Sequence, residues 1–128
     1  IHCRNYFRET MDILKKKWKH GLKGVFHCFT GNFENSIEVV YLGFFLGIGG
    51  VVTFKNSGLD KVLARVDPKF IVLETDAPYL APTPFRGKRN EPGYLEIIAE
   101  KVASVMGLEK AEIETITTQN SSVLFGIE

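Results

Sequence analysis

The sequence predicts an α/β protein in which helices connect the strands of a parallel sheet. Segments with an apolar residue every three or four positions alternate with short apolar runs, as expected when helices cross over between parallel strands. One apolar run, residues 70–73, leads directly into the carboxylates Glu74 and Asp76. Because proteins of this class keep their functional groups at the carboxyl ends of the strands, this run also indicates where a site lies.

The first helix is predicted over residues 7–18. One face of it carries apolar residues at i, i+4, i+7 and i+11, namely Phe7, Met11, Leu14 and Trp18. Lysines crowd its last turn, where cations favour the helix dipole, and Gly21 is predicted to cap it. His20 is predicted to be exposed at the C-terminal end of this helix.

The remaining elements follow in alternation. A strand stump at Ile1 is predicted to be followed by strands over residues 23–28, 44–48 and 70–75. Asn32 is predicted to cap a helix that ends at Gly43. Further helices are predicted over residues 59–66, 95–106 and about 113–124. The first of these stops before Pro68, since the residue preceding a proline disfavours the helical conformation.

Length and composition limit the class of protein. The chain has 128 residues and a formal net charge of +1, which is enough for one compact domain and excludes a globally basic nucleic-acid-binding protein. The apolar runs are too short to span a bilayer, and two cysteines do not make a disulfide framework, so we expect a cytoplasmic protein without a membrane segment. The chain opens at Ile1 inside a motif and without a signal peptide, so we expect a longer protein.

Metal-binding side chains stand at three predicted strand ends. His2 follows the stump, His27 ends the next strand, and Asp76 follows the last one. In a parallel sheet these ends lie on one rim. A single histidine at a strand end is usually only packed or hydrogen-bonded, but three such positions in register predict a site. Imidazole and carboxylate together suit Zn²⁺, Mn²⁺ or a similar divalent ion.

Four segments of the sequence resemble the motifs of a known protein family. Residues 2–4 (HCR), 24–31 (GVFHCFTG), 74–80 (ETDAPYL) and 86–92 (RGKRNEP) resemble, in the same order, the motifs of the TatD family of metal-dependent deoxyribonucleases. The resemblance covers essentially the whole chain. It implies the C-terminal half of a (β/α)8 TIM barrel of the metal-dependent hydrolase type. Residues 1–128 would form a single domain, from the stump of strand 5 through strand 8 and the C-terminal helices.

The resemblance also implies roles for individual residues. His2, His27 and Asp76 resemble the family's metal ligands, for which Zn, Mn and Mg remain open. Arg4 and the loop of residues 86–90 resemble positions that face the substrate, DNA or RNA. The family's opening His-x-His pair and its bridging glutamate have no counterpart here. A complete barrel needs ~250 residues, so we expect self-association or pairing with a missing N-terminal half.

The chemistry of phosphodiester hydrolysis assigns further roles. Asp76 would bind metal and could orient or deprotonate the attacking water. Glu74 shares its strand face and is either an acid/base or supporting group of the site or an interior polar residue bonded to a neighbouring strand. Tyr79 could stack on a base or simply pack. By strand alternation, Cys3 and Cys28 are predicted to be buried thiols turned away from the site.

The cations of the loop are predicted to contact phosphate. Arg86, Lys88 and Arg89 follow Asp76 closely, which favours phosphate contact over a merely solvated basic loop. Asn90 is grouped with them as a substrate-binding residue.

Three functions remain open on the sequence. The first is a metal-dependent deoxyribonuclease, with activity impaired in an isolated half. The second is a catalytically inactive half-barrel that acts as an assembly or binding module. The third is an amidohydrolase-like enzyme that acts on aminoacyl-tRNA or on a small substrate, and the basic loop argues against the small substrate.

Overall fold

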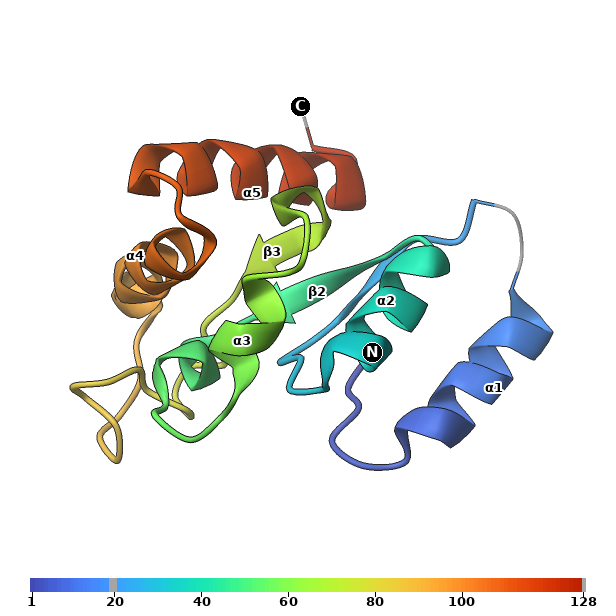
Figure 1. Ribbon diagram of the computed structural model, residues 1–128, viewed down its shortest axis with the longest axis horizontal. Coiled ribbons are helices and arrows are strands. Elements are labelled where there is room, and N and C mark those ends of the chain that lie inside the picture. The colour runs from blue at the N-terminus through green and yellow to red at the C-terminus, as the bar shows by residue number, and fades with distance from the viewer. Residues whose placement is uncertain (19–20, 128) are drawn as a thin grey trace.

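The protein contains a parallel sheet whose strands are joined by helices (Figure 1). The computed structural model describes residues 1–18 and 21–127. Its strands are β1 (Gly24–Phe26), β2 (Phe44–Ile48) and β3 (Ile71–Leu73), in the spatial order β1-β2-β3. Both strand pairs are parallel, and a parallel bridge between His2 and His27 adds the N-terminal stump beside β1. The predicted parallel α/β architecture is therefore confirmed.

The helices follow the predicted alternation. They are α1 (Phe7–Lys17), α2 (Phe33–Tyr41), α3 (Leu59–Leu63), α4 (Leu95–Met106) and α5 (Lys110–Phe125). Short 3-10 helices are η1 (Gly50–Thr53), η2 (Pro68–Phe70) and η3 (Pro92–Tyr94). Helix α2 packs against β2, and α4 and α5 pack against each other and against β3 (Figure 1). In the part of the chain that the structure describes, no helix is long and apolar enough to cross a membrane.

Local signals explain where most elements begin and end. Asn32 caps α2 through a reciprocal capping box with Asn35, as its place before the apolar pattern predicted. The prediction that α1 runs to Trp18 with Gly21 as its cap is wrong, because the helix ends at Lys17 and Trp18 is the C-cap residue. Lys19 and His20, for which an exposed helical end was predicted, lie outside the described residues.

Strand β3 is shorter than the sequence predicted. The Asp67 side chain accepts a hydrogen bond from the Lys69 amide and caps η2, so Phe70 belongs to this 3-10 turn. Beyond β3 the pairing continues for one residue, because the Glu74 amide donates to the Ile48 carbonyl at 3.0 Å. Glu74 is thereby fixed directly at the carboxyl end of the sheet.

The two faces of the sheet differ in composition. On the helix-covered face, Phe26, Leu46 and Ile71 pair in register and belong to one buried core cluster. The opposite face includes Gly47, which pairs with Val72. Because side chains alternate along a strand, His27 and Glu74 project from this second face, two residues beyond Val25 and Val72. These two candidate site residues therefore lie on the face away from the helical core.

Replacement of Leu46 tests the position of the core. Its side chain is fully buried in the central strand, so we expect Leu46→Ala to lower the free energy of unfolding by about 2–5 kcal/mol. Urea denaturation followed by circular dichroism measures this change. Ile13→Ala on the exposed side of α1 serves as the control and should change stability by less than ~0.5 kcal/mol. Equal effects of the two substitutions would contradict the assigned core.

Candidate metal centre

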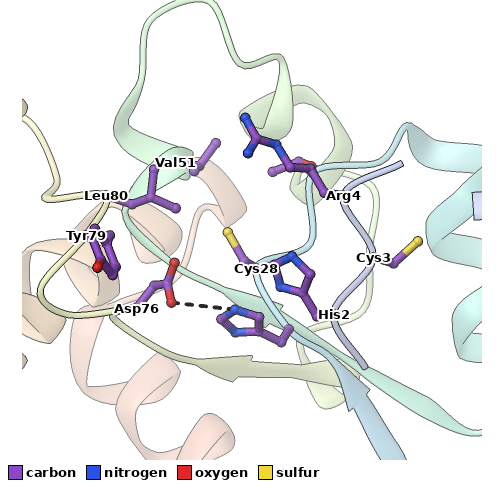
Figure 2. A pocket seen from close by; sticks show the side chains of 10 residues that line it. His2, Cys3, Arg4, Cys28, Val51, Asp76, Tyr79 and Leu80 are labelled. Carbon is purple, nitrogen blue, oxygen red and sulfur yellow. Dashed lines mark ion pairs between the residues drawn. The ribbon is translucent and has the colours of Figure 1, made fainter. Parts of the chain in front are cut away.

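The carboxyl ends of the strands surround one cavity (Figure 2). Its volume is about 380 Å³. Hydrogen bonds from the Ile1 ammonium to the Val25 carbonyl (2.7 Å) and from the His27 amide to the Ile1 carbonyl (2.9 Å) hold the stump against β1. The lining residues are His2, Cys3, Arg4, His27, Cys28, Thr30, Val51, Asp76, Tyr79 and Leu80. The three ligands predicted from the sequence thus line a single cavity.

His27 lies between two carboxylates. Its Nδ1 is 2.9 Å from Oε1 of Glu74, which is a hydrogen-bond distance. Its Nε2 is 3.6 Å from Oδ1 of Asp76, which is too long for a hydrogen bond. In a neutral imidazole whose Nδ1 donates to Glu74, Nε2 carries a lone pair. Two electron-pair donors then face each other across 3.6 Å, an arrangement that a cation between them would stabilise.

The spacing of this donor pair fits a shared metal ion. Ligands bound tetrahedrally to Zn²⁺ at about 2.1 Å lie roughly 3.4 Å from each other. The Nε2–Oδ1 separation of 3.6 Å agrees with that value. A neutral imidazole and a carboxylate are also the donor types that Zn²⁺ and Mn²⁺ accept. The pair of His27 and Asp76 therefore fits a divalent ion in both chemistry and distance.

The third predicted ligand lies beside the pair without completing it. The ring of His2 is tilted against that of His27, with 5.5 Å between centroids. Within residues 1–18 and 21–127, no group of three or more His, Cys, Asp or Glu side chains has the arrangement of a metal site. These residues thus supply a two-ligand pair with His2 nearby, rather than a closed three-ligand cluster.

Glu74 lies behind His27 and is largely buried. Its Oε1 also accepts a hydrogen bond from the Cys28 amide at 2.9 Å. Burial raises the pKa of the Glu74 carboxyl above its ordinary value, and the interactions with His27 and the Cys28 amide offset part of that rise. The contacts of Glu74 are thus with another side chain and with backbone, on the far side of the imidazole from Asp76.

The structure corrects the prediction for Cys28. This residue lines the cavity, and Figure 2 shows its sulfur turned toward the space between Arg4 and Asp76. The reason is its backbone, whose φ of 47° ends the regular alternation after β1. Cys3 also belongs to the cavity lining, but its sulfur points away from the cavity, with Sγ 3.6 Å from Oγ1 of Thr10. Both thiols are half-buried rather than buried.

The predicted substrate residues fall into two groups. Arg4 and Tyr79 line the cavity, and Tyr79 is 71% exposed. In the described part of the chain, the cavity lining includes none of Arg86, Lys88 and Arg89. The guanidinium of Arg86 instead lies 4.1 Å above the ring of Phe54, which fixes the base of the loop outside the cavity.

The structure gives Asn90 a different place from the one predicted. Its side chain is 1% exposed, and its amide donates to the carbonyls of Thr75 and Tyr79. The Asn90 backbone amide also donates to the Pro78 carbonyl at 3.0 Å. Asn90 therefore closes the turn that carries Asp76, whose φ of 55° requires such support. A buried and fully bonded amide is not available to a substrate.

Sequence reasoning missed the apolar side of the cavity. Val51, in η1, and Leu80, after the turn of Asp76, line it on the side opposite His2 (Figure 2). The segments that carry Val51 and Leu80 lie in close contact. A Cβ atom on Gly50 would overlap the Leu80 carbonyl oxygen. The Gly49–Gly50 pair after β2 was the sequence signal of this close approach.

The Cys28 thiol should lose its proton only at a higher pH than an ordinary thiol, because its pKa is raised. Burial, with the negative charges of Glu74 and Asp76 adding to it, raises its pKa from 9.0 to about 11. At pH 9 half of the unfolded thiols would ionise but only about 1% of the folded ones, so alkylation should be roughly 50-fold slower in the folded chain.

Iodoacetamide labelling of metal-free Cys3→Ser protein, with and without urea, measures this ratio by mass spectrometry. Because the folded pKa is the higher one, the thiol's contribution to stability is complete below pH 9 and is lost as the pH approaches 11. Equal alkylation rates would show that Cys28 is not shielded.

Known proteins are similar to this chain in sequence and in fold. The family model of TatD-related DNases matches residues 1–126. A Bacillus subtilis protein named as the uncharacterized metal-dependent hydrolase YabD is 41% identical over 128 residues, covering 99% of this chain and 50% of the relative. The 3'-5' ssDNA/RNA exonuclease TatD of Klebsiella pneumoniae is 38% identical over 135 residues, covering 100% of this chain and 51% of that protein.

A solved structure is similar to this chain in fold. The TatD homologue YjjV of Escherichia coli matches with a TM-score of 0.92 and 26% identity, over 99% of this chain and 49% of that one. The fold is thus half of a TatD barrel, and the chain spans about half the length of the curated relatives it matches. On its sequence and its fold alike, this chain belongs to the TatD-related DNase family.

Proposed function

We propose that this chain forms one half of a metal-dependent hydrolase that cleaves phosphodiester bonds in DNA. The observation that carries the proposal is the donor pair of His27 and Asp76, 3.6 Å apart at the edge of the sheet. The pair opens into a cavity that also exposes a cation, Arg4, and an aromatic ring, Tyr79. Metal ligands, a phosphate-binding cation and a base-stacking ring are the parts that such a reaction needs.

Each residue of the cavity has a task in this proposal. His27, Asp76 and His2 would hold a divalent ion, for which Zn²⁺, Mn²⁺ and Mg²⁺ are the candidates. The bound ion would supply positive charge against the phosphate and promote ionisation of a water molecule. Asp76 has a second oxygen with which it can accept a hydrogen bond from that water and orient it. Val51 and Leu80 form an apolar part of the cavity wall.

Substrate binding is divided between the cavity and the loop. Arg4 can donate two parallel hydrogen bonds to a phosphate, and the exposed ring of Tyr79 can stack on a base. The cations Arg86, Lys88 and Arg89 lie outside the cavity and would contact the backbone farther along the strand. A relative named as an exonuclease of single-stranded DNA and RNA supports a nucleic-acid substrate and leaves RNA as a second one.

Metal-dependent cleavage of single-stranded DNA tests the proposal. The chain would be mixed with the N-terminal half of the Bacillus subtilis relative YabD, which supplies the other half of the barrel. We expect cleavage of a labelled oligonucleotide that EDTA abolishes and that Asp76→Asn or His27→Gln lowers by a factor on the order of 100 or more. Lys61→Ala, exposed on α3, is the control and should retain full activity.

Other substrates decide between the remaining functions. Cleavage of an aminoacyl ester or a small amide without cleavage of DNA would replace the nuclease proposal with an amidohydrolase-like activity. If a mixed, folded and metal-loaded barrel cleaves none of these substrates, the chain acts as an assembly or binding module.

We also propose that the sheet is completed by a second chain segment. Among the described residues, β3 pairs with one strand only, and the stump pairs with β1 through a single bridge. Open edges of this kind expose unpaired N–H and C=O groups. Val25 and Phe45, on the face away from the helices, are only half-buried. The remainder of a longer protein or a second copy of this chain would cover both features.

Light scattering tests this second proposal. At micromolar concentration we expect the isolated chain to show a mass above the 14.4 kDa of one copy, because its open edges and apolar face pair with each other. Addition of the N-terminal half of the Bacillus subtilis relative should replace the self-associated species with a one-to-one complex. A stable monomer of 14.4 kDa, unchanged by that addition, would contradict the proposal.

A further inference from the structure

Glu74 and His27 make their contact across the central strand of the sheet. His27 follows β1 and Glu74 follows β3, with β2 between them in the strand order. Adjacent strands lie about 4.8 Å apart, so the ends of β1 and β3 are separated by roughly twice that distance. The Glu74 side chain spans this gap, with Oε1 2.9 Å from Nδ1 of His27.

Gly47 provides the space for this crossing. It lies in β2 and pairs with Val72 of β3, on the same face as Glu74. A Cβ atom built on Gly47 would overlap Oε2 of Glu74 and lie 3.1 Å from the Phe26 carbonyl oxygen. A side chain at position 47 would therefore compete with the Glu74 carboxylate for this space and require its Oε2 to move.

Hydrogen bonds hold both the carboxylate and the backbone of Glu74. Its Oε1 accepts the hydrogen of His27 Nδ1 and that of the Cys28 amide, each at 2.9 Å. The Glu74 amide is itself paired with the Ile48 carbonyl. The same oxygen thus binds the side chain of one residue and the backbone of the next, which restrains the rotation of the imidazole ring.

We infer that Glu74 is a positioning residue that fixes the tautomer of His27. We also infer that Gly47, which has no side chain, leaves the space that the Glu74 carboxylate occupies. With the proton held on Nδ1, the Nε2 lone pair faces the cavity and Asp76. Free histidine favours the opposite tautomer, in which Nε2 carries the proton and cannot bind a metal. The inference rests on the proposed function only in taking His27 as a ligand, since the tautomer itself is set without metal or substrate.

The tautomer can be measured directly. In metal-free protein with ¹⁵N-labelled histidine, long-range ¹H–¹⁵N spectra at pH 8.5 distinguish a protonated Nδ1 from a protonated Nε2, and His27→Gln identifies the His27 signals. We expect the proton on Nδ1 in the wild-type chain. A wild-type His27 that is protonated on Nε2 would overturn the inference. Because this measurement needs no variant in which Glu74 or Gly47 is replaced, it stays decisive even if such variants fail to fold.

Conservative and disruptive variants separate positioning from packing. Glu74→Gln keeps an oxygen that can accept from both donors and should keep the Nδ1 proton, whereas Glu74→Ala should move it to Nε2. Zn²⁺ affinity, measured by calorimetry, should fall about 10–100-fold in Glu74→Ala and recover most of that loss in Glu74→Gln. Circular dichroism verifies that each variant is folded. An unchanged tautomer in folded Glu74→Ala protein would overturn the inference.

Gly47, in β2, and Gly49, just after β2, provide a matched pair of variants, with Gly49→Ala as the control. Gly47→Ala should displace the carboxylate, shift the tautomer toward Nε2–H and lower Zn²⁺ affinity at least about 10-fold. A Cβ on Gly49 would meet Glu74 atoms only at 3.5 Å and beyond, an ordinary contact, so Gly49→Ala should leave the tautomer as it is. The same tautomer in both variants would remove Gly47 from the inference. If the tautomers behave as expected but the complemented barrel cleaves no DNA, only the proposed function fails.

Discussion

The candidate site depends on the parallel pairing of β1, β2 and β3 in that spatial order. This pairing brings the ends of β1 and β3 to one edge, so that residues almost fifty positions apart in the chain surround one imidazole. Had β1 and β3 been neighbours, His27 and Glu74 would stand on adjacent strands and no gap would be needed. Because β2 lies between them, the Glu74 side chain crosses that strand beside Gly47, which has no side chain to fill the space.

The electrostatics of the cavity favour a cation. Two carboxylates flank His27, and the turned Cys28 adds a thiol that stays neutral near pH 7, because burial and the two acids raise its pKa. Negative charge thus lies at Asp76 on the cavity wall and at Glu74 behind His27, whereas positive charge lies at Arg4 on the cavity wall and on the loop outside. A divalent ion would offset the inner charge and leave the outer cations free for a polyanion.

The loop after Asp76 serves two purposes in separate places. Its buried residue, Asn90, ties the carbonyls on either side of Asp76 and so supports a backbone conformation that an aspartate seldom adopts. Its exposed cations lie outside the cavity lining, with Arg86 stacked on Phe54. The buried part supports the backbone of Asp76, and the charged part lies outside the cavity lining. Among the described residues, β3 pairs with one strand only and the stump pairs with β1 through a single bridge.

The sequence by itself determined the parallel α/β class, the order of the elements and the strand ends at which His2, His27 and Asp76 stand, because periodicity and strand-end polarity are local properties. It also determined the cap of α2 at Asn32. Only the tertiary structure decided what depends on contacts between distant segments. These are the crossing of Glu74 over Gly47, the burial of Asn90, the exclusion of the basic loop from the cavity, and the direction of Cys28. The last of these followed from a single left-handed backbone residue, which strand alternation cannot reveal.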